Sequence, residues 1–223
     1  MLPFCRVRSD AGPLYRLTFD RCVVCIAQAV GDLNYSADRL RSAGRRSIPD
    51  RRVVGGIVLP MVGWSDFAAA APRIAEVFVR RHAATGNLCL LATTRSDGYP
   101  RISPLEPRIV DGRLVLVGMP GTVKFRDLAR DARFCMHTAT IDPQVGDGDV
   151  KLWGVAQDVQ DPDLHERFAE KVFAEAGLDL RGQQFRPFYV GALTGASSLH
   201  LENGQLTITI WKPGEAERVV RKT

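Results

Sequence analysis

Hydrophobic residues recur at helical spacing in two parts of the chain, which predicts two amphipathic helices. The first begins near Ser65 or Asp66, either of which can cap it, and ends at Gly86. Its apolar face consists of Phe67, Ala71, Ile74 and Phe78. The second begins at Asp161-Pro162, with the proline in the first turn, and ends at Gly177. Its inner face consists of Leu164, Phe168 and Val172.

Short apolar runs bounded by turn residues predict a series of strands around these helices. The runs span residues 88–94, 99–110, 114–119, 133–140, 150–160, 185–201 and 205–211. Tight turns at Arg95–Gly98 and Asp111-Gly112 join the first three runs, so we expect an antiparallel meander in which 99–110 pairs with 114–119. Many strands with few helices between them favour a mainly β (α+β) fold, an antiparallel β-barrel with flanking helices.

Charge divides the chain into two unlike parts. The formal net charge is +5, and residues 1–60 hold ten Arg and five Asp but no Lys or Glu, so 10 − 5 accounts for the whole excess. We therefore predict an atypical Arg-rich extension over 1–60 and a folded domain over 61–223. One hypothesis is that the extension is disordered, or that it is upstream sequence read as protein and the native protein starts near Met61. The alternative is a real basic segment that docks on the barrel or binds acidic partners.

Composition excludes several classes of protein. Residues 61–223 carry as many acidic as basic side chains, so we expect the domain to bind no nucleic acid. No apolar run approaches the roughly 18 to 20 residues that span a bilayer, which indicates no membrane partner and a cytoplasmic location. Five scattered cysteines do not make a disulfide framework, and the Cys22/Cys25 pair lacks the further ligands of a zinc site. No two histidines have metal-ligand spacing, so no metal is predicted.

A strand-to-helix junction at Met119–Lys124 carries the most specific chemistry. The expected strand ends at Pro120-Gly121, and Thr122 caps a short helix. The first N–H groups of a helix lack partners and its dipole adds positive charge there, so a hydroxyl from Thr122 and a charge from Lys124 suit a phosphate. The alternative is an ordinary capped helix with a solvated lysine.

The preceding strand adds donors to that junction. Arg101 and Ser103 point to the same face because strand side chains alternate. An Arg and a Ser beside a helix N-terminus would converge on a phosphate or a ribityl chain. Pro100 and Pro104 suit an edge strand, which leaves open that Arg101 lies at a wet edge.

The segments DGYPRIS, GTVKFRDLARDARF and ITIWKPG resemble the pyridoxamine 5′-phosphate oxidase-like family of split barrels, and the likeness runs from about residue 66 to 221. The resemblance implies a split β-barrel that binds FMN, or alternatively the deazaflavin F420. It implies that Arg101, Thr122 and Lys124 hold the cofactor phosphate. The isoalloxazine would lie near Ser103, Pro104 and Met119. It also implies a homodimer with two cofactor sites at the interface.

Departures from the family pattern limit the expected activity. Val123 stands where the authentic oxidase has a second basic residue, Glu106 replaces a strand-ending Lys, and the C-terminal signature for pyridoxal phosphate is missing. We therefore expect a flavin- or deazaflavin-dependent oxidoreductase acting on an unidentified small molecule, not an oxidase of vitamin B6. A non-catalytic flavin sensor or carrier is the alternative, and a nucleic-acid binder using residues 1–60 is a third class. Trp211 is expected to wall the cofactor pocket, and Trp153 to lie in the core.

Overall fold

The computed structural model describes residues 51–54, 57–139 and 145–222. All of them belong to the second of two compact units, Ala43–Thr223. The helices are α2 (Trp64–Ala70), α3 (Pro72–Ala84), α4 (Val123–Arg130) and α5 (Pro162–Ala176). The strands are β1 (Arg51–Val54), β2 (Ile57–Pro60), β3 (Cys89–Thr94), β4 (Pro100–Leu105), β5 (Arg108–Val110), β6 (Arg113–Leu116), β7 (Arg133–Thr138), β8 (Asp149–Asp158), β9 (Tyr189–Glu202), β10 (Gln205–Trp211) and β11 (Arg218–Lys222).

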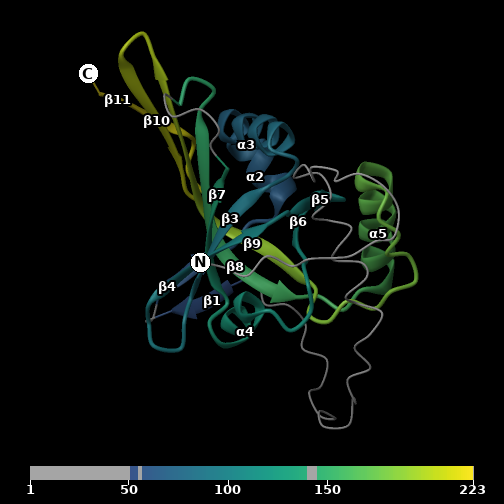
Figure 1. The fold of residues 1–223 in the computed structure, drawn as a ribbon. Helices are drawn as coiled ribbons and strands as arrows, with labels where there is room; N and C mark the ends of the chain where they lie inside the picture. The colour runs from purple at the N-terminus through teal and green to yellow at the C-terminus, as the bar shows by residue number, and fades with distance from the viewer. Residues whose placement is uncertain (1–50, 55–56, 140–144, 223) are drawn as a thin grey trace, which may run out of the picture. The chain divides into compact units, whose positions relative to one another are not determined.

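Nine strands form one antiparallel sheet in the order β11-β10-β9-β8-β7-β3-β4, with β6 attached to β9 and β5 to β6. Helices α2 and α3 lie together beside the middle of this sheet, α5 lies beside β5 and β6, and α4 lies near β4 (Figure 1). The prediction of a mainly β, antiparallel fold with flanking helices is therefore confirmed. Strands β1 and β2 pair only with each other in the described part of the chain.

The predicted meander is wrong at one point, because β4 does not pair with β6. The run 99–110 divides at Glu106-Pro107 into β4 and β5. Strand β4 pairs only with β3, whereas β6 pairs with β5 and β9, so β4 and β6 do not meet among the described strands. Proline lacks the N–H that a sheet ladder needs, so Pro104 and Pro107 oppose a continuous strand here.

The first predicted helix is two helices. Ala71 leaves helical geometry (φ −133°, ψ 61°), and Pro72 starts α3. A proline disfavours the α conformation in the residue before it and cannot continue the hydrogen bonds of the preceding helix. The predicted caps are also wrong, because α2 begins at Trp64 after Gly63 without a side-chain cap.

The apolar faces that the sequence predicted are buried. Phe67, Ala71, Ile74 and Phe78 are at most 1% exposed and join the main core inside the curved sheet. Leu164, Phe168 and Val172 of α5 join a second cluster with Val115 and Phe188. Asp161 caps α5 by accepting from the N–H groups of Asp163 and Leu164, and Gly177 ends it in the left-handed conformation, as predicted.

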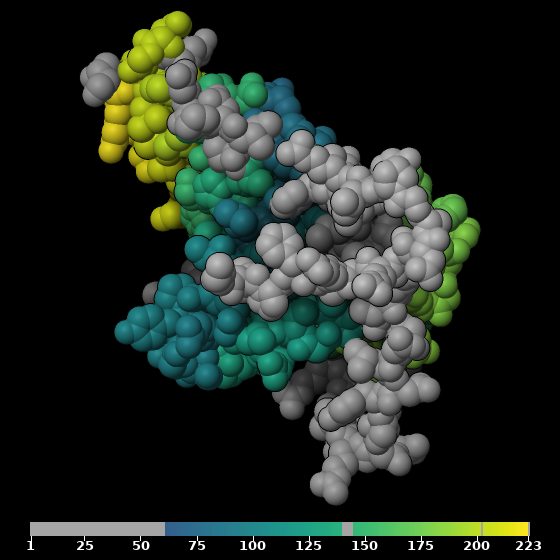
Figure 2. Space-filling view, in the orientation of Figure 1, coloured from purple at the N-terminus to yellow at the C-terminus, as the bar shows by residue number. Residues whose placement is uncertain are grey.

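The predicted hairpin turn at Asp111-Gly112 is confirmed by its backbone, and the C-terminal hairpin has a turn of the same kind. Asp111-Gly112 and Asn203-Gly204 all have positive φ, which tight hairpins require. The first turn joins β5 to β6, and the second joins β9 to β10. Strand β11 was not predicted. It extends the C-terminal hairpin, which stands as a yellow ridge in Figure 2.

The two cysteines among the described residues, Cys89 and Cys135, differ in burial. Cys89 is fully buried, and burial raises the pKa of its thiol to about 12. Cys135 is half-buried on β7. Cys22 and Cys25 lie outside the described residues.

The Arg-rich extension lies almost wholly outside the described residues, so its predicted disorder or mis-start stays a prediction. Within it, Arg51–Val54 pairs with Ile57–Pro60. The main sheet is first engaged by Val62, which exchanges two backbone hydrogen bonds with Leu193. None of the described helices is long and apolar enough to cross a membrane.

Candidate functional site

The start of α4 lies against β4. We call the break in strand pairing between β4 and β6 the opening. Lys124 Nζ donates a 2.8 Å hydrogen bond to the carbonyl oxygen of Pro104 on β4. A Cβ built on Gly118 would come 3.5 Å from Leu105 Cδ1, so the segment leading to α4 also touches β4. We call Arg101, Thr122 and Lys124 the clamp.

Arg101 is held in place by a buried carboxylate. Its Nε donates to Asp127 Oδ2 at 2.7 Å, and Asp127 is 3% exposed. Asp127 also accepts from Thr93 Oγ1 at 3.0 Å and lies 3.4 Å from Arg130 Nη2. Arg101 makes no other hydrogen bond with a described residue, so its two terminal nitrogens stay available.

The electrostatics of Asp127 favour its charged form. Burial by itself raises the pKa of a carboxyl group, but the hydrogen bonds from Arg101 and Thr93 outweigh it and lower the pKa of Asp127 below its ordinary value. Asp127 is therefore a fixed anion that orients Arg101. It does not supply a proton near neutral pH.

Thr122 and the first turn of α4 present unused donors. Thr122 is the N-cap residue, yet its side chain makes no capping hydrogen bond. Its Oγ1 is buried and has no hydrogen-bond partner among the described residues. A buried hydroxyl without a partner costs free energy, and an acceptor brought against the helix start would offset that cost.

Lys124 is partly removed from water. Burial lowers the pKa of Lys124 below its ordinary value, and the Glu106 carboxylate opposes that shift. An anion beside the ammonium group would replace the lost hydration and favour the charged form. The clamp thus offers a guanidinium, an ammonium, a hydroxyl and helix N–H groups, which together suit a phosphate.

The remaining predicted cofactor contacts border the clamp. Ser103 is half-buried on the same face of β4 as Arg101. Pro104 and Met119 are exposed at the opening, and Met119 is 40% exposed. The structure thus joins β4 to α4 through Lys124 and the Pro104 carbonyl and through Arg101 and Asp127. Ser103 lies on β4, Thr122 caps α4, and Met119 precedes it in the chain.

Trp211 lies apart from the clamp. It is 1% exposed and packs in the main core, with its ring centroid 5.1 Å from that of Phe67. Trp153 is half-buried and covers Gly195 on the other side of the sheet. The core tryptophan is therefore Trp211 and not Trp153, because the inward face of the sheet carries Trp211 with its neighbour Ala196.

Asp127 was not predicted as a site residue. It stands three residues after Lys124, on the inward side of α4 next to Leu128. A carboxylate on the apolar face of a short helix is the signal that would have identified it. No group of three or more potential metal ligands occurs among the described residues.

Comparison with known protein families gives a match over the middle of the chain. The family model for pyridoxamine 5′-phosphate oxidase matches residues 79–196, more than half of the 223-residue chain. That range contains β4, the clamp and β9 up to Ala196. No curated protein has a sequence that matches this one.

Solved structures resemble the chain at low sequence identity. A nimC/nimA family protein from Clostridium acetobutylicum is 15% identical, with a TM-score of 0.45, over 70% of this chain and 94% of that one. PhzG from Burkholderia lata 383, solved with tetrahydrophenazine-1-carboxylic acid, is 14% identical, with a TM-score of 0.47, over 69% and 93%. A pyridoxamine 5′-phosphate oxidase-related, FMN-binding protein from Nostoc punctiforme is 12% identical, with a TM-score of 0.46, over 68% and 95%. We draw nothing about function from these three likenesses.

Proposed function

The chain belongs to the pyridoxamine 5′-phosphate oxidase family, and from that premise we propose that its clamp binds the phosphate of a flavin-type cofactor, with FMN preferred and F420 the alternative. The observation that carries the proposal is the buried, unpartnered hydroxyl of Thr122 at the start of α4. Two cations are anchored to the same helix or near it: Arg101 is bonded to Asp127 of α4, and Lys124 of α4 is bonded to the Pro104 carbonyl. A phosphate oxygen would accept from that hydroxyl and from the helix N–H groups.

The isoalloxazine would extend along the opening between β4 and β6. Ser103 offers a hydroxyl there, and Pro104 and Met119 offer exposed apolar surface. Trp211 is not part of the proposed site, since its side chain is enclosed in the core.

Titration of the full chain with FMN and with F420, followed by quenching of cofactor fluorescence, tests this proposal. We expect micromolar binding of one of them. Lys124→Ala should weaken that binding roughly ten- to a hundredfold, because it removes a charge-assisted hydrogen bond worth about 1.5–3 kcal/mol. Arg126→Ala is the matched control, since Arg126 is an exposed cation on the same helix that makes no ion pair with a described residue. Failure of both cofactors to bind at micromolar levels would refute the proposal.

We further propose that the protein is an oxidoreductase acting on a small organic molecule. The cofactor would supply the hydride or electron-pair chemistry, and the protein the positioning and electrostatics. A non-catalytic flavin carrier is the second candidate. It is favoured by the pairing of Asp127 with Arg101 and Arg130, which leaves that carboxylate without a catalytic proton. Reduction of the bound cofactor, followed by a search for substrates that reoxidise it, separates the two.

A homodimer is proposed through the side of the sheet that faces away from α2 and α3, which we call the outer sheet face. Four direct cross-strand neighbours form one apolar row on it: Ile102, Ala92, Cys135 and Trp153. A second row consists of Leu199, Ile208 and Val220. Ile102 is 71% exposed, and exposed apolar rows on an open sheet face are typical of an interface. The occupant we propose is a second copy of this chain.

Sedimentation analysis of Ile208→Arg tests the dimer. We expect a dimer for the unaltered chain and a monomer for the variant, because a charge would be buried in the apolar interface. Val79→Arg on α3 is the control, since Val79 is an exposed apolar residue away from the outer sheet face, 48% exposed. A dimer that survives Ile208→Arg unchanged would show that the contact lies elsewhere.

A further inference from the structure

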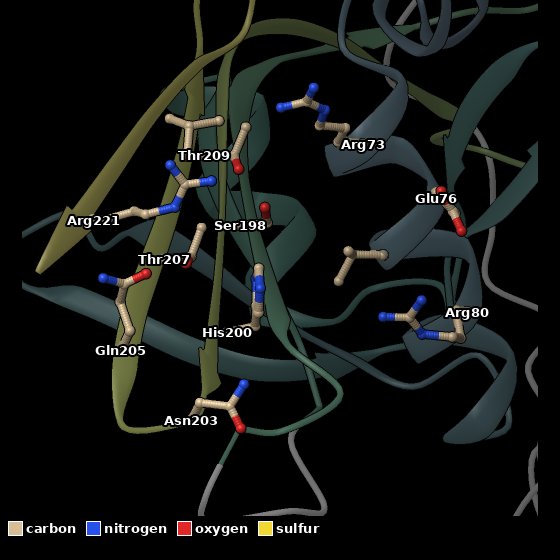
Figure 3. Close-up of a pocket in the computed structure, with 12 residues that line it drawn as sticks. Arg73, Glu76, Arg80, Ser198, His200, Asn203, Gln205, Thr207, Thr209 and Arg221 are labelled. Atoms are coloured by element: carbon tan, nitrogen blue, oxygen red, sulfur yellow. The ribbon is translucent and has the colours of Figure 1, made fainter.

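A polar pocket of about 640 Å³ lies between α3 and the C-terminal strands β9, β10 and β11 (Figure 3). Its lining shares no residue with the clamp. One side is a single face of α3, on which Arg73, Glu76 and Arg80 follow each other at helical spacing. In Figure 3 the Arg73 and Arg80 side chains extend from the helix toward the strands.

The floor is one face of the three C-terminal strands. Thr209 lies opposite Ser198, and Thr207 lies opposite both His200 and Arg221. Nearer the barrel the same face holds Trp211 and Ala196 in the main core. The hairpin continues beyond the core, and there its inward face changes from apolar to polar.

Two largely buried residues of the floor line the pocket and carry hydroxyl groups. Ser198 and Thr209 are each 5% exposed, and neither side chain hydrogen-bonds a described residue. These two open into the pocket, so a group bound there would satisfy them.

The cations of the pocket are incompletely neutralised. Arg221 forms no ion pair within the described part of the chain, and Arg80 donates to a backbone carbonyl, that of Asp147, at 2.9 Å. Arg73 reaches a carboxylate, that of Glu217, only at 4.0 Å. Glu76 lies one turn from both helix arginines and pairs with neither, so three guanidinium groups face one carboxylate.

We propose that this pocket binds a small phosphate ester at a site separate from the cofactor clamp. Guanidinium groups bind phosphate through paired hydrogen bonds, and the two floor hydroxyls add donors for its oxygens. The volume is that of a small-molecule site. Glu76 would accept a hydrogen bond from a hydroxyl elsewhere on the ligand, and it would repel a long polyanion.

The pocket remains accessible in the proposed dimer. Ile208 and Val220 of the outer sheet face alternate with Thr207, Thr209 and Arg221 along their strands, so they point to the opposite side of the hairpin. A partner on the outer sheet face would therefore leave the pocket open.

Calorimetric titration with glycerol 3-phosphate tests the proposal, with glycerol as the phosphate-free control. The titrations use the full chain saturated with its cofactor and, separately, the Lys124→Ala variant, so that the clamp does not bind the probe. We expect binding of glycerol 3-phosphate but not of glycerol. The double variant Arg80→Gln/Arg221→Gln should weaken it at least tenfold, whereas Lys222→Gln, on the next residue and the opposite face of β11, should leave it unchanged.

Thr209→Val provides a second variant that keeps side-chain volume and removes one hydroxyl. It should weaken binding severalfold while circular dichroism stays unchanged. The proposal is overturned if the unaltered chain does not bind the probe at millimolar concentrations, or if the arginine double variant binds as well as Lys222→Gln. Cofactor binding, measured on the same variants, should not change. A negative result with glycerol 3-phosphate can therefore be told apart from failure of the proposed cofactor site, which the cofactor titration of Lys124→Ala tests.

Discussion

His137 and Asp149 form an ion pair between β7 and β8, with 3.5 Å between Nε2 and Oδ2 and Lys151 on the other carboxylate oxygen. The hydrogen bond to Asp149 raises the pKa of His137. A raised pKa in the folded state stabilises the fold below the unfolded pKa of about 6.5, and this stabilisation disappears as pH rises through the folded pKa. We expect His137→Gln to lower the free energy of unfolding by about 1 kcal/mol at pH 5.5 and by much less at pH 9. Urea unfolding at both pH values measures this, and an equal loss at both would contradict it.

Asp127 gives a second prediction for a single residue. Asp127→Asn removes a buried charge that holds Arg101 and accepts from Thr93. We expect the free energy of unfolding to fall by about 2 kcal/mol, because partners in a partly buried network lose a charge-assisted acceptor. Glu170→Gln, at an exposed position on α5, should change it by less than about 0.5 kcal/mol. Chemical denaturation compares the two, and equal effects would show that Asp127 is not a structural anchor.

Single residues differed in how well the sequence revealed them. Thr122 and Lys124 were found because a glycine, a hydroxyl and a cation at a helix start are a local pattern. Asp127 was missed, since its role depends on Arg101 coming from another strand. Trp153 and Trp211 could not be sorted by alternation alone, because the β8–β9 register shifts between Trp153 and Gly154.

That register shift makes Gly154 critical for two strands. A Cβ built on Gly154 would collide with the carbonyl oxygen of Ala192 on β9, where backbone has little room to move. We expect Gly154→Ala to lower the free energy of unfolding by about 2 kcal/mol or more. Gly63→Ala is the control, since a Cβ there meets nothing within 4 Å. Thermal unfolding of both variants measures the difference, and similar midpoints would refute the prediction.

Elements were predicted best where local signals agreed. Helix α5 has an Asp cap, a proline in its first turn, an apolar face and a final glycine, and all four are observed. The pairing of β4 was not predictable from hydrophobic periodicity, because pairing depends on which strands the chain brings together. The short β11 carries three basic residues among five and has no clear alternation, so its sequence did not indicate a strand.

At the scale of the molecule, we expect the main sheet to fold without residues 1–60. All nine strands of the main sheet lie after residue 61, and β1 and β2 pair only with each other in the described part. We expect a chain of residues 61–223 to keep its β-sheet circular dichroism and to unfold within about 3 °C of the full chain. Loss of cooperative unfolding would contradict this and assign a structural role to the Arg-rich extension.

The unpaired edge of β4 has a consequence for the behaviour of the protein at high concentration. An open edge strand normally invites a strand from another molecule, which can start aggregation. Here Pro100 and Pro104 have no N–H to offer, and Lys124 occupies the Pro104 carbonyl. An incoming polypeptide would find two missing donors and a blocked acceptor along six residues. The opening is thus unsuited to recruiting another chain, although its cations and hydroxyl remain free to receive a small anion.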